Sequence, residues 1–296
     1  MTYANEPQIQ SAGSTLSQLQ MAISSGGVLY LDGGWQTIVD GLMSEALKAK
    51  VSINIGRRVS NIKETVNKTS KKLTISTPSW RIYFSDGSNI LTSNLVIAGS
   101  PTDVQLLFED SKPEFQSHLF GDGRITETRR PNPVRVACLD VALSTLPNPR
   151  IPVAIGIDTP FFLSVHSATA KLAPQDAALI HVMKYLGSTH EPNLKDDRLE
   201  LEAFLESVQP GWRDVLVKER FLPNMVVYNA IVSADQGGIL GRPDTKVPQT
   251  ENLYLVGDWI GPEGLLADAS FASAKHVAQQ ILKVQPKAQP KLISYA

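Results

Sequence analysis

Residues 252–275, with the sequence NLYLVGDWIGPEGLLADASFASAK, decide the fold of this chain. The apolar run from Leu253 to Val256 predicts a buried strand, and this strand ends at Gly257. Because glycine has no side chain, a ligand can approach the backbone closely there. Asp258 then places a carboxylate at the end of the strand, where it is suited to bind hydroxyl groups.

The second half of this segment predicts a loop that leads into a helix. Gly261 and Gly264 allow the loop to bend, so that the backbone N–H groups of Leu265 and Leu266 point outward. Apolar and small residues then recur at helical spacing over residues 266–283. Because the first N–H groups of a helix lack internal partners and its N-terminus is electropositive, the segment predicts a ligand cradle.

Composition limits the classes of function. The 296 residues include 28 Lys and Arg against 29 Asp and Glu, for a net charge of −1, so we do not expect general binding of nucleic acid. No run of about 18 apolar residues occurs, which argues against a transmembrane helix. The single cysteine, Cys138, excludes an internal disulfide and a multi-cysteine metal site, and it suits a reducing compartment. Since the N-terminus has no signal-peptide pattern, we expect a soluble protein of the cytoplasm.

The segment 252–275 resembles the C-terminal flavin-binding motif of the FAD-dependent amine oxidase and phytoene desaturase superfamily. In that family the motif holds the ribityl chain and the pyrimidine edge of the isoalloxazine. The resemblance implies FAD as the cofactor, with Asp258 on a ribityl or pyrophosphate oxygen and Gly257 and Gly264 beside the flavin. It also implies that the amides of Leu265 and Leu266 face flavin N1 and C2=O, where a helix N-terminus favours the reduced anion. The alternative is a plain strand–loop–helix with a capping aspartate.

An earlier segment resembles the part of the family in which the chain re-enters the FAD domain. It consists of LDGGW at residues 31–35, an amphipathic helix that extends to Ala49, and a strand expected at residues 51–56. The resemblance implies that Val59 bonds the adenine through its backbone. Lys50 stands where the family usually has a glycine, which is a small departure.

Two more segments extend the match. LVIAGSP at residues 95–101 resembles a later strand and turn, which implies that Ala98 and Gly99 pass close to the dinucleotide. GGILGRP at residues 237–243 resembles the phytoene-dehydrogenase-like branch more than the monoamine oxidase branch. A β-hairpin with ordinary turns is the alternative explanation for residues 31–62 and for residues 95–101.

The family fold is of the FAD/NAD(P)-binding type, a mixed α/β (α+β) flavoprotein fold with a mixed-sheet substrate domain. Carried over, residues 1–110 are part of the FAD-binding domain and residues 111–245 are the substrate-binding domain. Residues 246–285 are the flavin-binding strand–loop–helix that returns to the FAD domain, and residues 286–296 are a frayed tail.

The flavin performs the difficult chemical step in such enzymes, so the mechanism does not demand a catalytic residue in every branch. Amine oxidases often use a lysine that holds a water at flavin N5, and Lys184 is the only strand-like candidate for it. The candidate pocket residues are His166, Ser167, Lys184, Tyr185, Tyr228 and Asn229, each of which is also explained as a structural strand residue. The five histidines, at positions 118, 166, 181, 190 and 276, are too scattered in the sequence to predict a metal site.

The family's N-terminal strand–G-x-G-x-x-G–helix unit, which holds the pyrophosphate, has no counterpart in this sequence. GDGRIT at residues 121–126 lacks the third glycine, and GGILG at residues 237–241 precedes Arg-Pro. The resemblance spans about residues 26–283 and corresponds to the later part of a full member. We therefore expect a fragment or one half of an FAD-dependent oxidoreductase that transfers hydride to flavin, with a small-molecule or lipid-like substrate and a separate N-terminal dinucleotide-binding segment. The alternative is a non-catalytic remnant or interaction subunit that no longer binds FAD.

Overall fold

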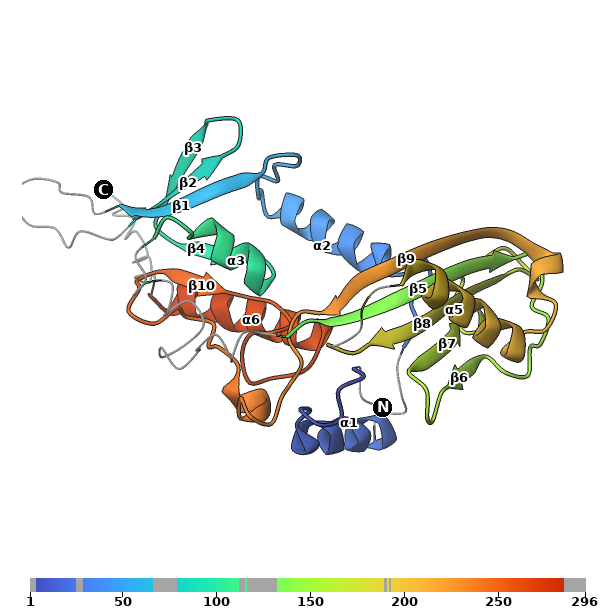
Figure 1. Ribbon diagram of the computed structural model, residues 1–296. Helices are drawn as coiled ribbons and strands as arrows, with labels where there is room; N and C mark the ends of the chain where they lie inside the picture. Colours follow the sequence, from blue (N-terminus) through green and yellow to red (C-terminus); the bar gives the residue numbers. More distant parts are fainter. Residues whose placement is uncertain are drawn as a thin grey trace, which may run out of the picture. The chain divides into compact units, whose positions relative to one another are not determined.

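A computed structural model of the chain describes residues 4–24, 29–65, 79–111, 115, 132–188, 191 and 193–284. The GDGRIT segment, His118, His190 and the expected tail lie outside these residues. The chain divides into two compact units (Figure 1), and each is described by itself. Unit 1 comprises Met1–Ile55 and Asn132–Gly238, and unit 2 comprises Gly56–Pro131 and Ile239–Ala296.

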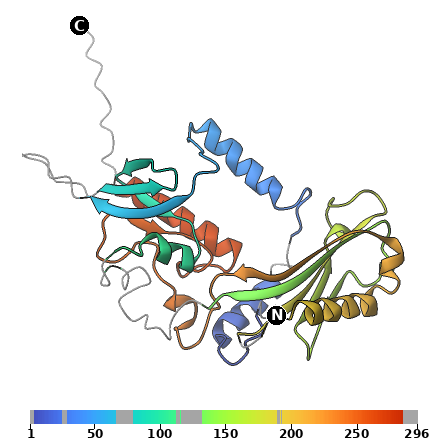
Figure 2. The same ribbon diagram turned by 45° about the horizontal axis from the view of Figure 1, so that its top comes forward.

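Unit 1 is built on a five-stranded antiparallel sheet with the strand order β6-β7-β8-β5-β9. The strands are β5 (Val134–Leu143), β6 (Val153–Ile155), β7 (Phe161–Val165), β8 (Ala178–Leu186) and β9 (Leu216–Tyr228). Helix α5 (Leu194–Val208) lies along one face of this sheet (Figure 2). The apolar patterns predict strands at residues 134–141, 161–166 and 179–185 and a helix at residues 196–208. The structure confirms these elements as β5, β7, β8 and α5.

The core of unit 1 fills the space between the sheet and α5. Because successive side chains of a strand point to opposite faces, the alternate residues Ala137, Leu139 and Val141 of β5 face one way and are fully buried. Leu201 and Leu205 of α5, four residues apart on one helix face, are fully buried in the same cluster. The even-numbered residues of β5 therefore point to the other face of the sheet.

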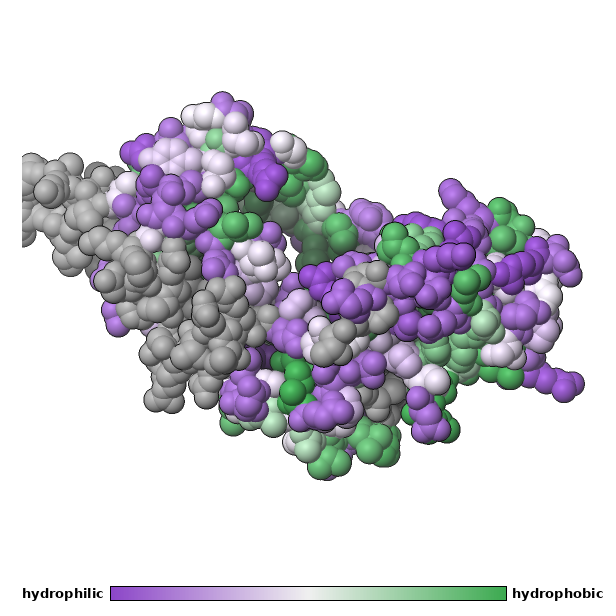
Figure 3. Space-filling view, viewed as in Figure 1, coloured by the Kyte–Doolittle hydropathy of each residue, from purple (hydrophilic) through white to green (hydrophobic). Residues whose placement is uncertain are grey.

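The described part of unit 1 contains four more helical segments. They are α1 (Ala12–Ser24), α2 (Gln36–Lys48) and the 3-10 turns η2 (His166–Ala168) and η3 (Trp212–Val215). None of the residues of α2 is buried. In Figure 3, apolar side chains form green surface over α1 and α2.

Hydrogen bonds join the N-terminal segment of unit 1, up to Ile55, to its second segment, Asn132–Gly238. Ser11 N–H donates to the carbonyl of Val232 and Ala234 N–H donates to the carbonyl of Ile9, each at 2.8 Å. Lys171 N–H donates to the Asp32 carboxylate at 2.8 Å. The structural division thus differs from the boundaries expected after residues 110 and 245, because these long-range bonds leave no mark in the local sequence.

The strand expected at residues 51–56 is wrong. Its apolar residues alternate, but residues 51–55 form no sheet ladder with any described residue, and Val51, Ile53 and Ile55 are exposed. Alternation predicts a strand only where a partner strand is present to accept its hydrogen bonds.

The described residues of unit 2 form two small sheets. The antiparallel sheet has the order β1-β2-β3, and the parallel pair consists of β4 and β10. The elements are β1 (Val59–Thr65), β2 (Ser79–Phe84), β3 (Asn89–Thr92), β4 (Leu95–Ile97), α3 (Pro101–Leu107), η4 (Gly238–Gly241, at the boundary with unit 1), β10 (Leu253–Leu255) and α6 (Ala267–Val284). The strand and helix expected within residues 252–283 are confirmed.

Each strand of the parallel pair leads into a helix, β4 into α3 and β10 into α6. Helix α6 packs on the pair through Val277, which forms an apolar cluster with Tyr254 and Val256. The small residue Ala269 is fully buried near the start of the helix, which permits close packing there. No helix in the described part of the chain is long and apolar enough to cross a membrane.

Candidate functional site

The carboxyl ends of β4 and β10 meet at one edge of unit 2. Leu255 pairs with Ile97, so the two chains leave the sheet side by side, at Ala98 and Gly99 on β4 and at Gly257 on β10. The indole N–H of Trp259, which is buried, donates to the carbonyl of Gly99 at 3.0 Å. In open α/β sheets ligands bind outside the carboxyl ends of the strands. This edge is therefore the candidate cofactor site.

The N-terminus of α3 is closed by its own side chains. The Ser100 hydroxyl accepts from the N–H of Asp103 at 3.1 Å, and the Asp103 carboxylate accepts from the N–H of Ser100 at 3.2 Å. This capping box satisfies two of the N–H groups at the helix start. The carboxylate also places negative charge there, so this helix end is a poor site for an anionic group.

The N-terminus of α6 is open by comparison. In the part of the chain that the structure describes, the N–H groups of Leu265 and Leu266 have no hydrogen-bond acceptor. Leu266 has a φ of 52°, which a residue with a side chain rarely adopts. The carbonyl of Gly264 accepts from Arg242 Nη1 at 2.9 Å, which fixes the loop from its other side. The two leucine amides are thus available to a ligand.

Gly264 is required by the packing of the loop on α6. Its φ is 73°, and a Cβ would lie 2.9 Å from the backbone nitrogen of Ala269 and from the carbonyl carbon of Asp268. The same test at Gly257, with a φ of 153°, places a Cβ 3.1 Å from the indole nitrogen of Trp259. The sequence pattern favours close approach of a ligand at both glycines, whereas the packing of the chain itself already requires them.

The structure brings seven of the eight predicted cofactor residues to the two loops at this edge. Asp258 is half-buried and lies between Gly257 and Trp259. Val59, the eighth residue, begins β1 and pairs with Phe84, so it belongs to the other sheet of unit 2. A pocket of about 370 Å³ lies beside the same loop, within the size range of small-molecule sites. Its lining includes Arg242, Ile260, Gly261, Pro262, Ser273 and His276.

Solved structures share this fold. No protein-family model matches the chain, and no curated protein matches it in sequence. An oxidoreductase from Methanosarcina mazei superposes with a TM-score of 0.60 at 16% identity, over 84% of this chain and 55% of that chain. The mixed α/β fold class predicted from the sequence is confirmed.

Two further structures are similar. Reduced UDP-galactopyranose mutase matches with a TM-score of 0.55 at 13% identity, over 81% of this chain and 50% of its own. A candidate protoporphyrinogen oxidase from Exiguobacterium sp. 255-15 matches with a TM-score of 0.55 at 13% identity, over 94% of this chain and 57% of its own. The chain therefore spans about half the length of the structures that it matches. Identities this low establish the fold alone.

The pocket residues predicted in unit 1 do not form one site. The Lys184 ammonium points to α5, where it contacts Asp197 Oδ1 and Glu200 Oε2 at 2.8 Å each. Tyr185 follows Lys184 on β8 and therefore points to the opposite face of the sheet. The Ser167 hydroxyl accepts from the N–H of Leu179 at 2.9 Å. Tyr228 ends β9, and Asn229 follows it. Lys184 thus anchors α5 to the sheet.

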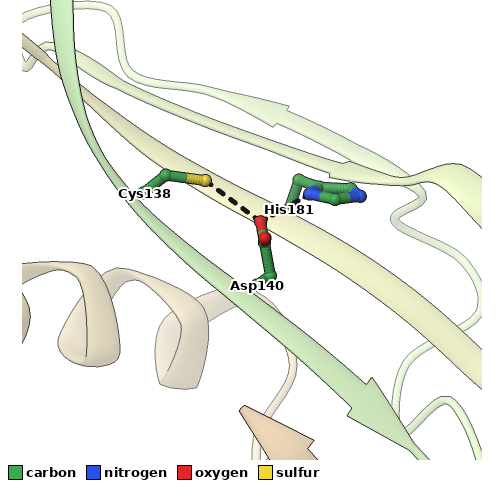
Figure 4. Close-up of side chains that lie close together, drawn as sticks. All are labelled: Cys138, Asp140 and His181. Carbon is green, nitrogen blue, oxygen red and sulfur yellow. Dashed lines mark hydrogen bonds and ion pairs between the residues drawn. The ribbon is translucent and has the colours of Figure 1, made fainter. Parts of the chain in front are cut away.

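A row of polar side chains crosses the sheet of unit 1 on the face opposite α5. Ser164, His181, Asp140 and Arg220 are in register on β7, β8, β5 and β9. His181 Nδ1 lies 2.5 Å from Asp140 Oδ1, and Arg220 Nη2 donates to Asp140 Oδ2 at 2.6 Å. Figure 4 shows that Cys138 also points to the Asp140 carboxylate, and its Sγ donates to Oδ1 at 3.1 Å.

The charge state of Asp140 fixes the proton on His181. Burial raises the pKa of the Asp140 carboxyl, but hydrogen bonds from His181, Arg220 and Cys138 outweigh it and hold the pKa well below its usual range. An ionised carboxylate only accepts hydrogen bonds, so Nδ1 of His181 carries the hydrogen. Nε2 of a neutral His181 is then the acceptor. Burial, with Asp140 nearby, raises the pKa of the Cys138 thiol far above its ordinary value.

His166 extends this polar row along the same face. Its ring lies 4.1 Å from that of His181 and 4.7 Å from that of Tyr30. Burial, helped by His181 and opposed by Asp140, lowers the pKa of His166 to about 4, so its imidazole is neutral at neutral pH. The Tyr30 hydroxyl lies 2.8 Å from the Ser164 hydroxyl, within hydrogen-bonding distance. Of these residues, only His166 is predicted from the sequence to line the pocket. Asp140, a charged residue within the apolar run at residues 134–143, is the signal that could have indicated the rest of the row.

Proposed function

We propose that this chain supplies the flavin-contacting loop and the substrate part of an FAD-dependent oxidoreductase of the amine oxidase or phytoene desaturase type. The observation that carries the proposal is the open N-terminus of α6 beside Gly257 and Gly99, at the carboxyl edge of a parallel pair. Such an edge with free N–H donors suits a ligand that gathers negative charge.

The residues at this edge fit a flavin. The amides of Leu265 and Leu266 would donate to the pyrimidine edge of the ring, and Asp258 would accept from a ribityl hydroxyl. Ala98, Gly99, Gly257 and Gly264 would form the wall along the dinucleotide, and Val59 would bond the adenine through its backbone. When bound, FAD supplies a two-electron acceptor for hydride. The chain's own task is to hold that acceptor and to stabilise its negative charge.

A separate N-terminal dinucleotide-binding segment is part of the proposal. The parallel sheet of unit 2 has only two strands among the described residues, whereas parallel sheets are normally larger and covered on both faces. Helix α2 and its N-cap residue Trp35 also carry exposed apolar side chains, which in the helix include Val39, Leu42 and Leu47. Such surfaces mark sites of contact with another segment or chain. The proposed location of the protein is the cytoplasm.

The structure supports a structural role for Lys184, because two carboxylates already hold its ammonium. We therefore assign no catalytic lysine. The substrate class remains as proposed from the sequence, a small or lipid-like molecule with an oxidisable C–H bond.

The test is to express the chain alone and together with a strand–G-x-G-x-x-G–helix segment, and to record the absorption spectrum of each purified sample. Bound flavin in the co-purified complex, and little or none in the chain alone, is the expected result. A complex that forms but carries no flavin would favour the alternative, an interaction subunit without a cofactor.

A further inference from the structure

Three side chains that commonly bind metal ions converge on the face of the unit 1 sheet opposite α5. Cys138 and Asp140 are two residues apart on β5 and so share this face, and His181 of β8 lies directly opposite Asp140. One ligand atom from each, Sγ, a carboxylate oxygen and an imidazole nitrogen, lie within 4.8 Å of one another. Figure 4 shows the thiol and the imidazole on either side of the carboxylate.

We propose that Cys138, Asp140 and His181 form a binding site for a divalent metal ion of the Zn²⁺ class. Sulfur, nitrogen and oxygen donors together suit Zn²⁺, Co²⁺ and similar ions, whereas Mg²⁺ and Ca²⁺ prefer oxygen ligands alone. This inference is independent of the proposed flavin chemistry, which lies in unit 2.

The distances fit an ion after a small adjustment. Donor atoms about 2.0 to 2.3 Å from a tetrahedral Zn²⁺ lie roughly 3.3 to 3.7 Å apart. The Cys138 sulfur is 3.1 Å from Asp140 Oδ1, and His181 Nδ1 is 2.5 Å from the same oxygen. The imidazole must therefore move away from the carboxylate by about 1 Å. Its nitrogen must also come within about 3.7 Å of the sulfur, and the three ligand atoms lie within 4.8 Å of one another without an ion. Rotation of the His181 and Cys138 side chains is the adjustment that the proposal requires.

Arg220 prepares the carboxylate for this role. Its guanidinium holds Asp140 Oδ2 through Nη2 at 2.6 Å and Nε at 3.2 Å, which leaves Oδ1 directed at Cys138 and His181. Ligating carboxylates are normally oriented in this way by a hydrogen-bond donor. The positive charge of Arg220 opposes a cation, but its side chain is 66% exposed and its charge is screened by water.

Two other side chains lie beside the cluster. The His166 ring contacts the His181 ring, and the uncharged ring of Tyr30 contacts His166. The thiolate and the carboxylate together would balance the two charges of the ion. Exposure increases from the Cys138 residue, at 3%, to the side chains of Asp140, at 10%, and His181, at 25%. The site is therefore closed behind the sulfur and open beside the imidazole, where a fourth ligand can enter, as in catalytic zinc sites.

Without a metal ion the three side chains are hydrogen-bonded to one another, because Asp140 accepts from both Cys138 and His181. Binding replaces these two hydrogen bonds with three metal–ligand bonds. The thiol loses its proton to solvent as the sulfur–metal bond forms, and the hydrogen on Nδ1 of the neutral His181 moves to Nε2, which leaves Nδ1 free to bind the ion. Binding of each ion therefore releases one proton. The apparent affinity must then rise with pH. The hydrogen-bonded cluster alone is the competing explanation.

Cobalt provides the direct probe. Co²⁺ is titrated into the purified full chain after removal of metals with a chelator, and the thiolate-to-cobalt charge-transfer band is recorded together with the visible d–d bands. We expect one equivalent to bind, Zn²⁺ to displace it, and Cys138→Ser to remove the charge-transfer band. Asp140→Asn and His181→Gln should each weaken binding more than about 100-fold, beyond the 10–100-fold typical of outer-shell partners.

His276→Gln is the matched control, since it removes one exposed imidazole from unit 2 and should leave the titration unchanged. Far-ultraviolet circular dichroism shows whether each variant folds. Zn²⁺ should also raise the melting temperature of the wild type and of His276→Gln but not of Cys138→Ser. A folded wild type without a charge-transfer band at stoichiometric Co²⁺, or with the same band in Cys138→Ser, would overturn the proposal and leave the hydrogen-bonded cluster.

Discussion

The indole of Trp259 donates to the carbonyl of Gly99 at 3.0 Å, across 160 residues of sequence. This bond joins the loop after β10 to the turn after β4, and so it holds together the two segments that form the candidate cofactor edge. The indole is almost fully buried, so its N–H could not turn to water if the partner were lost.

Trp259→Phe should lower the free energy of unfolding of the chain. The substitution removes this hydrogen bond, which contributes about 0.5–1.5 kcal/mol, and the smaller ring adds a further loss because Trp259 is buried. Urea unfolding followed by circular dichroism measures the change. Trp35→Phe is the control because Trp35 is 64% exposed. Equal effects of the two substitutions would show that the bond contributes nothing.

Gly264→Ala should destabilise the chain more than Gly261→Ala. Both glycines have a positive φ, 73° and 78°, so both substitutions strain the backbone by about 1–2 kcal/mol. Only at Gly264 would the new Cβ lie 2.9 Å from backbone atoms of α6, while nothing lies within 4 Å of it at Gly261. Thermal unfolding of the two variants compares them. If Gly261→Ala proved equally or more damaging, the close packing of the loop on α6 would be disproved.

The ion pairs of Lys184 predict a loss of stability at high pH. Burial lowers the pKa of the Lys184 ammonium, but Asp197 and Glu200 outweigh it and raise the pKa above 10.5. Since the folded chain holds this proton more tightly than the unfolded chain, the stabilisation is complete below pH 10.5 and disappears as the pH rises through the raised value. Urea unfolding between pH 8 and pH 11 should show a steeper decline for the wild type than for Lys184→Met. Parallel declines would mean that the pairs contribute no pH-dependent stability.

The strand–loop–helix of residues 252–283 could be predicted from sequence because its information is local. The strand, the glycines and the helix that starts after Leu266 follow one another within about 30 residues, and each has its own signal of apolarity, turn chemistry or period. The structural need for a glycine at position 264 could not be predicted from these local signals. Its packing against Asp268 and Ala269 depends on the exact path of the loop.

The cluster around Asp140 could not be predicted in the same way. Cys138 and Asp140 share a strand face by alternation, but His181 joins them only through the pairing of β5 with β8, 41 residues apart. Sequence spacing made the histidines look scattered, and the register that brings one of them to a thiol and a carboxylate is a property of the folded sheet. The attachment of residues 1–55 to unit 1 was missed for the same reason.

The central claim, that the loop after β10 binds flavin, is tested most directly by titrating FAD into the purified chain and following the quenching of flavin fluorescence. Asp258→Ala is compared with Glu263→Ala, which removes an exposed carboxylate from the same loop. We expect weak binding by the wild type and by Glu263→Ala, because the N-terminus of α3, the other helix that starts at this edge, is closed by its capping box and is not free to hold the pyrophosphate. Asp258→Ala should bind about 10–150-fold more weakly, the equivalent of one buried hydrogen bond to a charged group. Equal affinities for the two variants, or tight stoichiometric binding by a monomer of the chain alone, would contradict it.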